Sequence, residues 1–235
     1  MSLAYRALAL LLTYPSEEQR MLLPIAIEAI ESETRIPAPV RRALTRLADE
    51  IGGGELYEAQ ERYVWLFDRT RSLSLNLYEH VHGESRDRGQ AMVALLELYR
   101  ARGLELSANE LPDHLPVFLE FLSTQPEAEA ASLLGEASHV LAALGQRLHK
   151  RDSAYRAVFG ALAALAADPA DAEALAALLN EPDDNPDDLA AMDKLWAETA
   201  VTFGPSDVGC PKAELLVKSM NASPPPLNRR AAPAA

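Results

Sequence analysis

Residues 77–92 read LYEHVHGESRDRGQAM, a segment that contains five charged residues and two histidines. A solvated surface helix does not require so dense a mixture of both charge signs. Gly83 can adopt a positive φ angle at little steric cost, and Ser85 is a preferred residue for capping a helix N-terminus. We therefore expect a loop that runs directly into an amphipathic helix over residues 85–102, with the Asp87 carboxylate favourably placed in its first turn.

This predicted helix carries an apolar stripe on one face. The stripe consists of Met92, Leu95, Leu96 and Tyr99. Gly89 lies inside the same helix, where a glycine costs roughly 1 kcal/mol relative to alanine. We therefore expect another backbone to approach the helix at Gly89.

Helical periodicity continues through the rest of the chain. The predicted helices cover residues 3–13, 37–51, 55–68, 85–102, 112–124, 126–150, 152–167, 171–180 and 189–199, and another begins after Ser16. Leu73, Leu75 and Leu77 alternate with polar residues but have no second alternating run to pair with, so we expect an extended or short helical connection there. The sequence predicts an all-α fold: a single-domain bundle of roughly eight to ten helices over residues 1–204, followed by a flexible tail over residues 205–235.

Local signals predict how several helices begin and end. Ser16 and Gln19 have the spacing of a capping box. Pro24 is expected to break or restart the second helix, because a proline in a helix interior costs about 3 kcal/mol. Glycines 52–54 indicate a C-cap and hinge, since no Gly-Lys-Ser/Thr follows them as it would in a phosphate-binding loop. A kink is expected near Gly135.

The composition describes an acidic globular protein. The chain has 235 residues, of which 49% are hydrophobic, and a net charge of −13. This charge disfavours nucleic acids and anionic membrane surfaces as partners and favours a basic one. Several of the acidic residues are clustered at residues 181–188, which we expect to form a solvated loop.

Compartment and targeting signals point to a soluble protein. Cys210 is the only cysteine, which excludes an internal disulfide framework and fits a reducing compartment. The apolar residues 7–12 are few, show no clear cleavage site and give way to Pro15, so an amphipathic first helix is a better interpretation than a signal peptide. No stretch approaches the ~20 apolar residues of a membrane span.

Three histidines raise the question of a metal site. His80 and His82 have a spacing that suits ligands on an extended chain, and Glu79, Glu84 and His114 are further candidates. A catalytic zinc site needs three protein ligands and an open position, and no third ligand stands at a defined spacing. We therefore expect these histidines to form hydrogen bonds within the loop, and no metal to be bound.

Residues 83–87 invite comparison with the G-x-S-x-G nucleophile elbow of hydrolases. The final glycine is absent, and no strand of a parallel sheet precedes the segment. Ser85 is better explained as a helix cap. Since no other hydroxyl or thiol lies in an activating context, we expect no catalytic residue and no enzymatic activity.

Two interpretations stay open for Arg86, Asp87 and Arg88. They can form an ion-pair network that fixes the loop, or contact a partner directly, because an arginine fork pairs well with carboxylates in either role. We expect Asp87 to be structural and at least one of the two arginines to face the partner.

The stripe formed by Tyr63, Leu66 and Phe67 has two interpretations as well. An apolar stripe at helical spacing is usually part of the core. Lining of a binding groove is the alternative.

Two runs of sequence resemble a known family. They are EHVHGESRDRGQAM at residues 79–92 and ELPDHLPVFLEFL at residues 110–122. Both are similar to the NarJ family of cytoplasmic assembly chaperones for the catalytic subunit of respiratory nitrate reductase, and the resemblance spans residues 3–204. That family belongs to the wider all-helical group of redox-enzyme maturation chaperones that includes TorD and DmsD. The first run is very specific, whereas the DHLP core of the second is shared across the wider group.

The resemblance implies a chaperone that binds the N-terminal peptide of the apo catalytic subunit. That peptide resembles a twin-arginine signal, being basic and then apolar. The chaperone would hold it while molybdenum cofactor and iron–sulfur centres are inserted, and would restrain premature membrane docking. It would have no permanently bound cofactor, would meet the molybdenum cofactor through its client, and would act beside molybdenum cofactor biosynthesis proteins. An acidic helical protein with an apolar groove is compatible with such a peptide.

By the same resemblance, Asp113, His114 and Glu120 are candidates for the peptide-binding surface. From the residues alone, Asp113 reads as the N-cap of the helix over residues 112–124.

Two other classes of function stay open. A nucleotide- or molybdenum-cofactor-binding maturation factor would need a site that the sequence does not reveal. A structural subunit of a membrane redox complex would need a large exposed apolar face.

Overall fold

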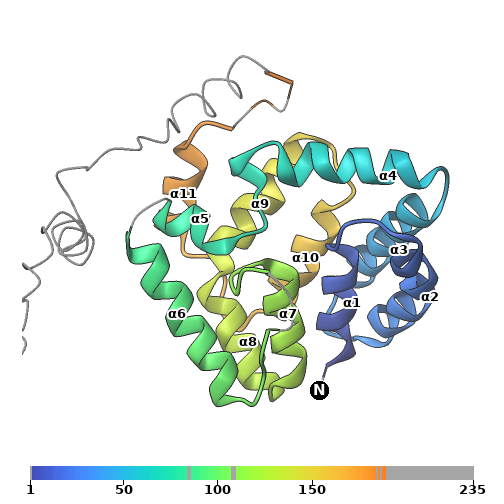
Figure 1. Ribbon diagram of the computed structural model, residues 1–235. Coiled ribbons are helices and arrows are strands. Elements are labelled where there is room, and N and C mark those ends of the chain that lie inside the picture. The colour runs from blue at the N-terminus through green and yellow to red at the C-terminus, as the bar shows by residue number, and fades with distance from the viewer. Residues whose placement is uncertain (1, 84–85, 107–109, 184, 186, 189–235) are drawn as a thin grey trace, which may run out of the picture. The chain divides into compact units, whose positions relative to one another are not determined.

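Every regular element in the described part of the chain is helical, so the all-α prediction is confirmed (Figure 1). The protein is seen in a computed structural model that describes residues 2–83, 86–106, 110–183, 185 and 187–188. The predicted helix over residues 189–199, the predicted tail and Cys210 lie outside those ranges. Within them, the nearest feature to a strand is one isolated antiparallel bridge between Asn76 and His114.

The helices follow the predicted order, with eleven α-helices in the described ranges where roughly eight to ten were expected. They are α1 Leu3–Leu11, α2 Glu17–Ser32, α3 Ala38–Gly52, α4 Leu56–Tyr63, α5 Leu77–His82, α6 Arg86–Ala101, α7 Leu115–Thr124, α8 Glu127–Glu136, α9 Ser138–Lys150, α10 Arg156–Leu165 and α11 Ala172–Asn180. A π-helical turn, η1 Val64–Asp68, extends α4, and a 3₁₀ turn, η2 Arg71–Leu73, follows it. The expected connection between these turns and the central segment is therefore partly helical and partly extended.

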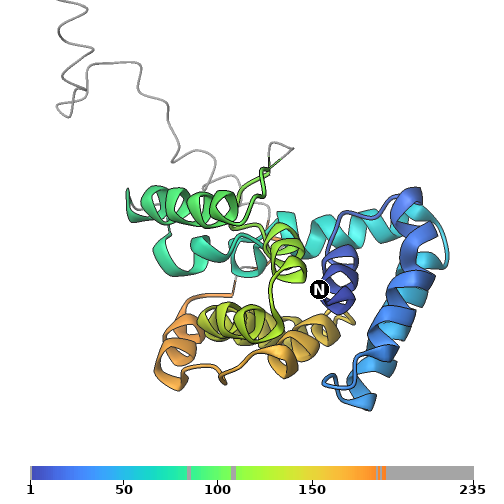
Figure 2. The same ribbon diagram turned by 90° about the horizontal axis from the view of Figure 1, so that it is seen from below.

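The first helix lies at the centre of the packing. It contacts α2 on one side and α7 on the other (Figure 2). Tyr5, Leu8, Leu11 and Leu12 are fully buried, because the helical spacing of these residues turns several sides of α1 toward neighbours. On the other side of the core, α10 packs against both α9 and α3.

Aromatic rings join α4 and η1 to the core. Tyr63 and Phe67 are each 5% exposed, and their ring centroids lie 5.0 Å apart. Phe67 packs edge-on against Tyr155 at 5.1 Å, and the Tyr63 hydroxyl donates a hydrogen bond of 2.9 Å to the Leu12 carbonyl. Leu66 is buried beside them. The stripe Tyr63, Leu66 and Phe67 therefore forms part of the core.

A buried arginine connects three segments of the chain. Arg147 of α9 is 2% exposed and donates hydrogen bonds to the Ser72 carbonyl at 2.9 Å and the Leu178 carbonyl at 2.7 Å. Its guanidinium therefore satisfies carbonyls at the end of η2 and near the C-terminus of α11, where positive charge also interacts well with the helix dipole.

The capping box at the start of α2 is half formed. The Ser16 hydroxyl accepts the Gln19 backbone N–H at 3.1 Å, as predicted. The Gln19 side chain does not return to Ser16; it donates to the carbonyls of Leu10 at 2.8 Å and Thr13 at 3.1 Å. Gln19 is 3% exposed, and it uses its amide to satisfy carbonyls at and just beyond the end of α1.

The prediction that Pro24 breaks the second helix is wrong. It lies inside α2, which continues without interruption from Glu17 to Ser32. Pro24 is on the exposed face of the helix, and its missing N–H leaves the Arg20 carbonyl without its intrahelical partner. The buried face, formed by Leu23, Ala26 and Ile30, holds the helix together across the proline.

Three further predictions need correction. Apart from the backbone of its own helix and its two chain neighbours, no heavy atom of the described residues lies within 4 Å of the position that a Cβ would occupy at Gly89, so no other backbone approaches it there. The long helix over residues 126–150 is two helices, α8 and α9, which meet at Ala137 close to the expected kink. The acidic loop is only partly solvated, because Asp183 pairs with Arg151 at 2.8 Å and Asp187 accepts the Trp65 indole N–H at 3.0 Å.

None of the helices in the described ranges is both long enough and apolar enough to cross a membrane.

Replacing Pro24 with alanine is expected to stabilise the protein. The new N–H can bond the Arg20 carbonyl, so the free energy of unfolding should rise by about 1–3 kcal/mol. Urea denaturation of Pro24→Ala measures this. Pro39→Ala is the matched control, because Pro39 lies exposed in the first turn of α3, where no intrahelical bond is lost. Equal effects of the two substitutions would show that α2 is not strained at Pro24.

Candidate functional site

The two motifs identified in the sequence are bonded to each other through Asp113. Its backbone carbonyl accepts the Leu77 N–H at 3.0 Å, and its carboxylate oxygen Oδ2 accepts the Tyr78 N–H at 3.1 Å. In the opposite direction, the Leu115 N–H donates to the Leu75 carbonyl at 2.8 Å. Asp113 therefore satisfies the two amides at the N-terminus of α5, which have no partner within their own helix.

The prediction that Asp113 caps its own helix is wrong. The N-cap position of α7 is occupied by His114, which makes no side-chain capping bond. Asp113 is fully buried and turns away from α7 toward α5, 35 residues earlier in the chain. It therefore lies inside the fold and not on a peptide-binding surface.

Burial raises the pKa of the Asp113 carboxyl, and the Tyr78 N–H and the charge of Arg88 act against that rise. The second carboxylate oxygen, Oδ1, has no hydrogen-bond partner among the residues that the structure describes. Burying a carboxyl group that has one unsatisfied oxygen costs free energy. The hydrogen bond from the Tyr78 N–H of α5 therefore explains why an acidic residue occupies this position.

The segment expected to be a loop before α6 is itself helical. It forms α5, which ends at Gly83 with the predicted positive φ of +55°. His80 lies in this short helix, and its Nε2 is 2.8 Å from the Ser74 carbonyl oxygen. The ring of His82 packs against that of Tyr78, with centroids 5.7 Å apart. His80 therefore forms a hydrogen bond, as expected, but its partner Ser74 precedes the segment and does not lie within it.

Burial lowers the pKa of both His80 and His114 below the usual value of 6.5. The Arg147 charge lowers that of His80 further, while nearby carboxylates act in the opposite direction on both rings. Within the described ranges, no group of three or more histidine, cysteine or acidic residues is arranged to hold a metal ion.

An ion pair joins α5 to α6. The Arg88 guanidinium lies 3.0 Å from the Glu79 carboxylate. Burial alone would raise the pKa of Glu79, but hydrogen bonds from Ser74, Arg88 and Asn76 together with the Arg88 charge hold it below its usual value. The Arg88 side chain is only 20% exposed, and it pairs within the fold. The expectation that at least one of Arg86 and Arg88 faces the partner stays a prediction.

The remaining charged residues of the motif are placed as follows. Asp87 is in the first turn of α6, as predicted, and is exposed. Glu84 and the side chain of Arg86 lie outside the described residues.

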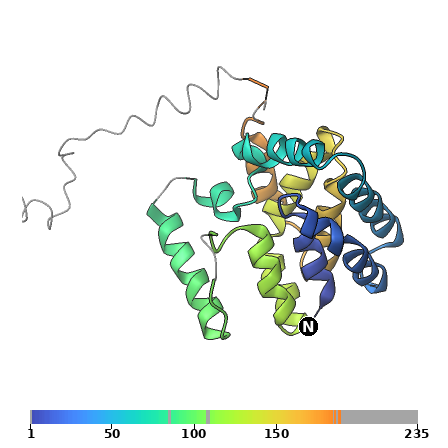
Figure 3. The same cartoon turned by 45° about the vertical axis from the view of Figure 1, so that its right-hand side comes forward.

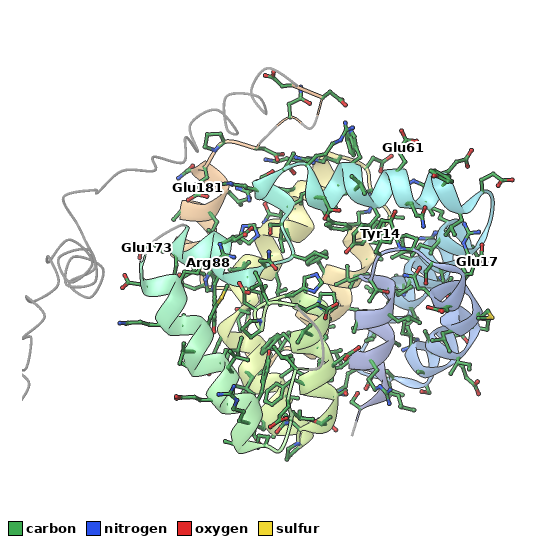
Figure 4. All side chains as sticks on the ribbon, viewed as in Figure 1. Tyr14, Glu17, Glu61, Arg88, Glu173 and Glu181 are labelled. Atoms are coloured by element: carbon green, nitrogen blue, oxygen red, sulfur yellow. The ribbon has the colours of Figure 1, made fainter. Side chains whose placement is uncertain are left out.

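A polar hollow of about 600 Å³ lies beside the motif. Its walls include Glu79, His80, His82 and Arg88 from the motif, Arg71 and Arg147 from the core side, and Glu181 after α11. Figure 4 labels Arg88 and Glu181. We call it the motif hollow. Three guanidiniums and two carboxylates line it, so it can accept charged groups of either sign and does not by itself select one.

A second hollow, of about 350 Å³, is mainly apolar and opens on α7. Its apolar walls include Leu3, Leu104, Leu106, Val117 and Phe121, and its charged residues are Arg6, Glu105 and Glu120. We call it the α7 hollow. Of the predicted site residues only Glu120 lines it, whereas Glu105 and Arg6 were missed because they come from segments without a motif.

Helix α6 lies at the edge of the bundle (Figure 3), and it contributes a residue to each hollow. Arg88 near its start lines the motif hollow, and Tyr99 near its end lines the α7 hollow. Tyr99 is anchored there by a hydrogen bond of 2.7 Å to the Pro112 carbonyl and by ring packing on Phe121 at 4.5 Å. Eleven residues of helix separate Arg88 from Tyr99, or about 16 Å.

Comparison with known proteins gives consistent matches. The profile described as nitrate reductase delta subunit matches residues 33–161. The chain is 41% identical over 202 residues to the nitrate reductase molybdenum cofactor assembly chaperone NarJ of Escherichia coli (strain K12), covering 85% of this chain and 84% of that protein. It is 38% identical over 198 residues to the probable chaperone NarW of the same strain, covering 84% and 82%. It is 30% identical over 156 residues to the probable chaperone NarJ of Bacillus subtilis (strain 168), covering 65% and 82%.

Loss of the Asp113 carboxylate should destabilise the protein. In Asp113→Ala the Tyr78 N–H loses its buried acceptor, which should lower the free energy of unfolding by about 1–3 kcal/mol. Asp113→Asn is the control, because its side-chain carbonyl keeps the acceptor while removing the buried charge. Chemical denaturation of both variants measures the difference. If the asparagine variant lost as much stability as the alanine variant, the hydrogen bond from Tyr78 would not be the main contribution of Asp113 to the free energy of unfolding.

The buried histidines should make stability fall in mild acid. Their pKa values are lower in the folded protein than in the unfolded chain, so the unfolded chain binds more protons as pH falls below about 6.5. Their contribution to stability is therefore present above that pH and decreases below it. Comparing urea midpoints at pH 7.5 and 5.5 tests this: the double variant His80→Gln with His114→Gln should show a smaller decrease than the natural chain. An identical decrease would exclude these rings as the cause.

Proposed function

Because this chain belongs to the nitrate reductase delta subunit family, we propose that it is an assembly chaperone for respiratory nitrate reductase. It binds the N-terminal region of the apo catalytic subunit while molybdenum cofactor is inserted, and before the enzyme docks at the membrane. The proposal rests on the comparison with the assembly chaperone NarJ of Escherichia coli (strain K12). The two chains are 41% identical, and the match covers more than four-fifths of each. The protein acts in the cytoplasm without catalysis of its own, and meets the cofactor through its client.

We assign the client peptide to the α7 hollow. Apolar side chains form its walls, and the two carboxylates of Glu105 and Glu120 outnumber the one guanidinium, of Arg6. A peptide that is basic and then apolar fits this arrangement, with its apolar side chains in the hollow and its basic ones near the two carboxylates. The net charge of −13 favours the encounter in the same direction. Glu120, exposed on α7, is the residue from the DHLP segment that we expect to meet the client.

The motif at the α5–α6 junction has a divided role in this proposal. The Glu79–Arg88 pair, half-buried, holds the start of α6 in place. Asp87, the residue directly before Arg88, is exposed and can face a partner. The proposal therefore changes the expected division in part: Arg88 is mainly structural and Asp87 faces the partner, while the Arg86 side chain lies outside the described residues and its role stays a prediction. Asp87→Ala should then reduce enzyme maturation in cells at an unchanged melting temperature, whereas a fall in both would assign Asp87 to the fold.

Calorimetry with a synthetic peptide of the first fifteen or so residues of the catalytic subunit tests the assignment. Glu120→Lys should weaken binding about tenfold, equivalent to about 1.4 kcal/mol, because it reverses a charge beside the hollow. Affinity in the natural chain should also decrease as salt rises, since exposed charges are screened over about 8–10 Å at physiological ionic strength.

The control is Glu97→Lys, an equivalent reversal at an exposed position of α6 that lines neither hollow. It should leave affinity almost unchanged at physiological salt. If both variants bound as the natural chain does, the α7 hollow would not be the client site. If the protein co-purified with the mature enzyme as well as the apo form, it would be a permanent subunit and not a chaperone.

A further inference from the structure

Helix α2 exposes three large apolar side chains on one face. Met21 is 70% exposed, Leu22 is 47% exposed and Ile25 is 66% exposed. The opposite side of the helix is buried and packs against α1 and α3. Single exposed apolar residues are ordinary, but three that adjoin at helical spacing form a patch, which is characteristic of an interaction surface.

Four glutamates flank this patch along the same helix. Glu17 and Glu18 precede Met21 by four and three residues, and Glu28 and Glu31 follow Ile25 by three and six. All four are exposed, and none forms an ion pair or side-chain hydrogen bond within the described part of the chain. Figure 4 shows Glu17 at the outer side of the bundle. We call the three apolar residues and these four glutamates the α2 face.

The two pairs of glutamates differ in their effect on the helix. Glu17 and Glu18 lie in the first turn, where carboxylates interact favourably with the helix dipole. Glu31 lies in the last turn and Glu28 just before it, where negative charge is unfavourable and lysine or arginine would stabilise the helix. The last turn contains no basic residue. Helix stability therefore explains the first pair and not the second.

We propose that the α2 face docks a cationic amphipathic helix of a partner protein. The apolar side of that helix covers Met21, Leu22 and Ile25, and its lysine or arginine side chains meet the glutamates at both ends. Glu18 and Glu28 are ten residues apart, or about 15 Å along the axis. A helix laid beside α2 meets both when its basic residues are separated by about the same number of positions.

The charges argue against other occupants of this face. A second copy of the chain would place four carboxylates against four, since a two-fold contact pairs a surface with itself. An anionic membrane would be repelled in the same way. A cationic helix neutralises both ends of the face and covers its apolar centre.

This surface is distinct from the proposed client site. None of its residues lines the α7 hollow, and residues 17–31 precede the segment matched by the family profile, which begins at residue 33. The inference therefore does not rest on the proposed function, and the two can fail separately.

The test uses a synthetic helical peptide of eighteen residues with one leucine face and lysines at positions 4 and 14, and a second peptide with glutamates at those positions. Fluorescence titration of the full chain should show binding of the lysine peptide and at least tenfold weaker binding of the glutamate peptide. The double variant Met21→Asp with Ile25→Asp should bind the lysine peptide at least tenfold more weakly than the natural chain. Val93→Asp, at an apolar position of α6 that is 55% exposed, is its control and should bind normally.

A second variant separates binding from folding. Glu28→Lys with Glu31→Lys removes the unfavourable charge at the end of α2, so its melting temperature should rise while its affinity for the lysine peptide falls about tenfold. A purely structural role cannot produce these opposite changes. The proposal is overturned if affinity is unchanged in both double variants, or if both peptides bind equally.

Two further measurements distinguish the other occupants. Loss of dimerisation in the aspartate variant by size-exclusion chromatography would assign the face to self-association, and vesicles of anionic lipid that bind the natural chain but not this variant would assign it to a membrane. Either result overturns the proposal. The client peptide should bind both α2 variants normally; weakened binding would show that the α2 face belongs to the client site and is not a second surface.

Discussion

The buried carboxyl of Asp113 is the constraint on which the central part of this fold depends. A six-residue helix such as α5 is too short to be stable alone, because helix nucleation is costly and few intrahelical bonds form. Asp113 satisfies the two amides at its N-terminus, 3.0 and 3.1 Å away, from the turn that precedes α7. The position of α5 then fixes Glu79, which holds Arg88 and with it the start of α6. One residue, through its backbone carbonyl and its carboxylate, thus links the turn before α7 to α5, and α5 links to α6 through Glu79 and Arg88.

Local patterns predicted the elements better than the contacts between them. The positive φ of Gly83 and the burial of Tyr63, Leu66 and Phe67 follow from short-range rules, and each is present. The capping rule failed at Asp113, because that rule considers only the residues immediately after the cap. The acceptor was required by an amide 35 residues earlier, and no spacing within the sequence encodes that distance.

The surfaces were harder to predict than the core. The α7 hollow is formed by the start of α1, the segment after α6 and one side of α7, so its lining residues are far apart in the sequence. Glu120 was found through a motif, whereas Glu105 has no distinguishing neighbours. The exposure of Pro24 likewise depends on which face of α2 is buried, and a proline rule without that information predicts a break. Periodicity identifies the buried face of a helix, but it does not identify what the exposed face meets.

The size of the α7 hollow limits what it can contribute to binding. At about 350 Å³ it can enclose only a few apolar side chains, each worth about 1.5–3 kcal/mol when fully buried. Association costs an estimated 4–15 kcal/mol in lost translational and rotational freedom, and ordering the peptide adds to this, so apolar burial alone leaves little net affinity. In the proposed complex the carboxylates beside the hollow must therefore supply a substantial part of the binding free energy. A complex balanced in this way is stable with a basic client segment in place and dissociates readily once folding of the client withdraws that segment, which is the behaviour that an assembly chaperone requires.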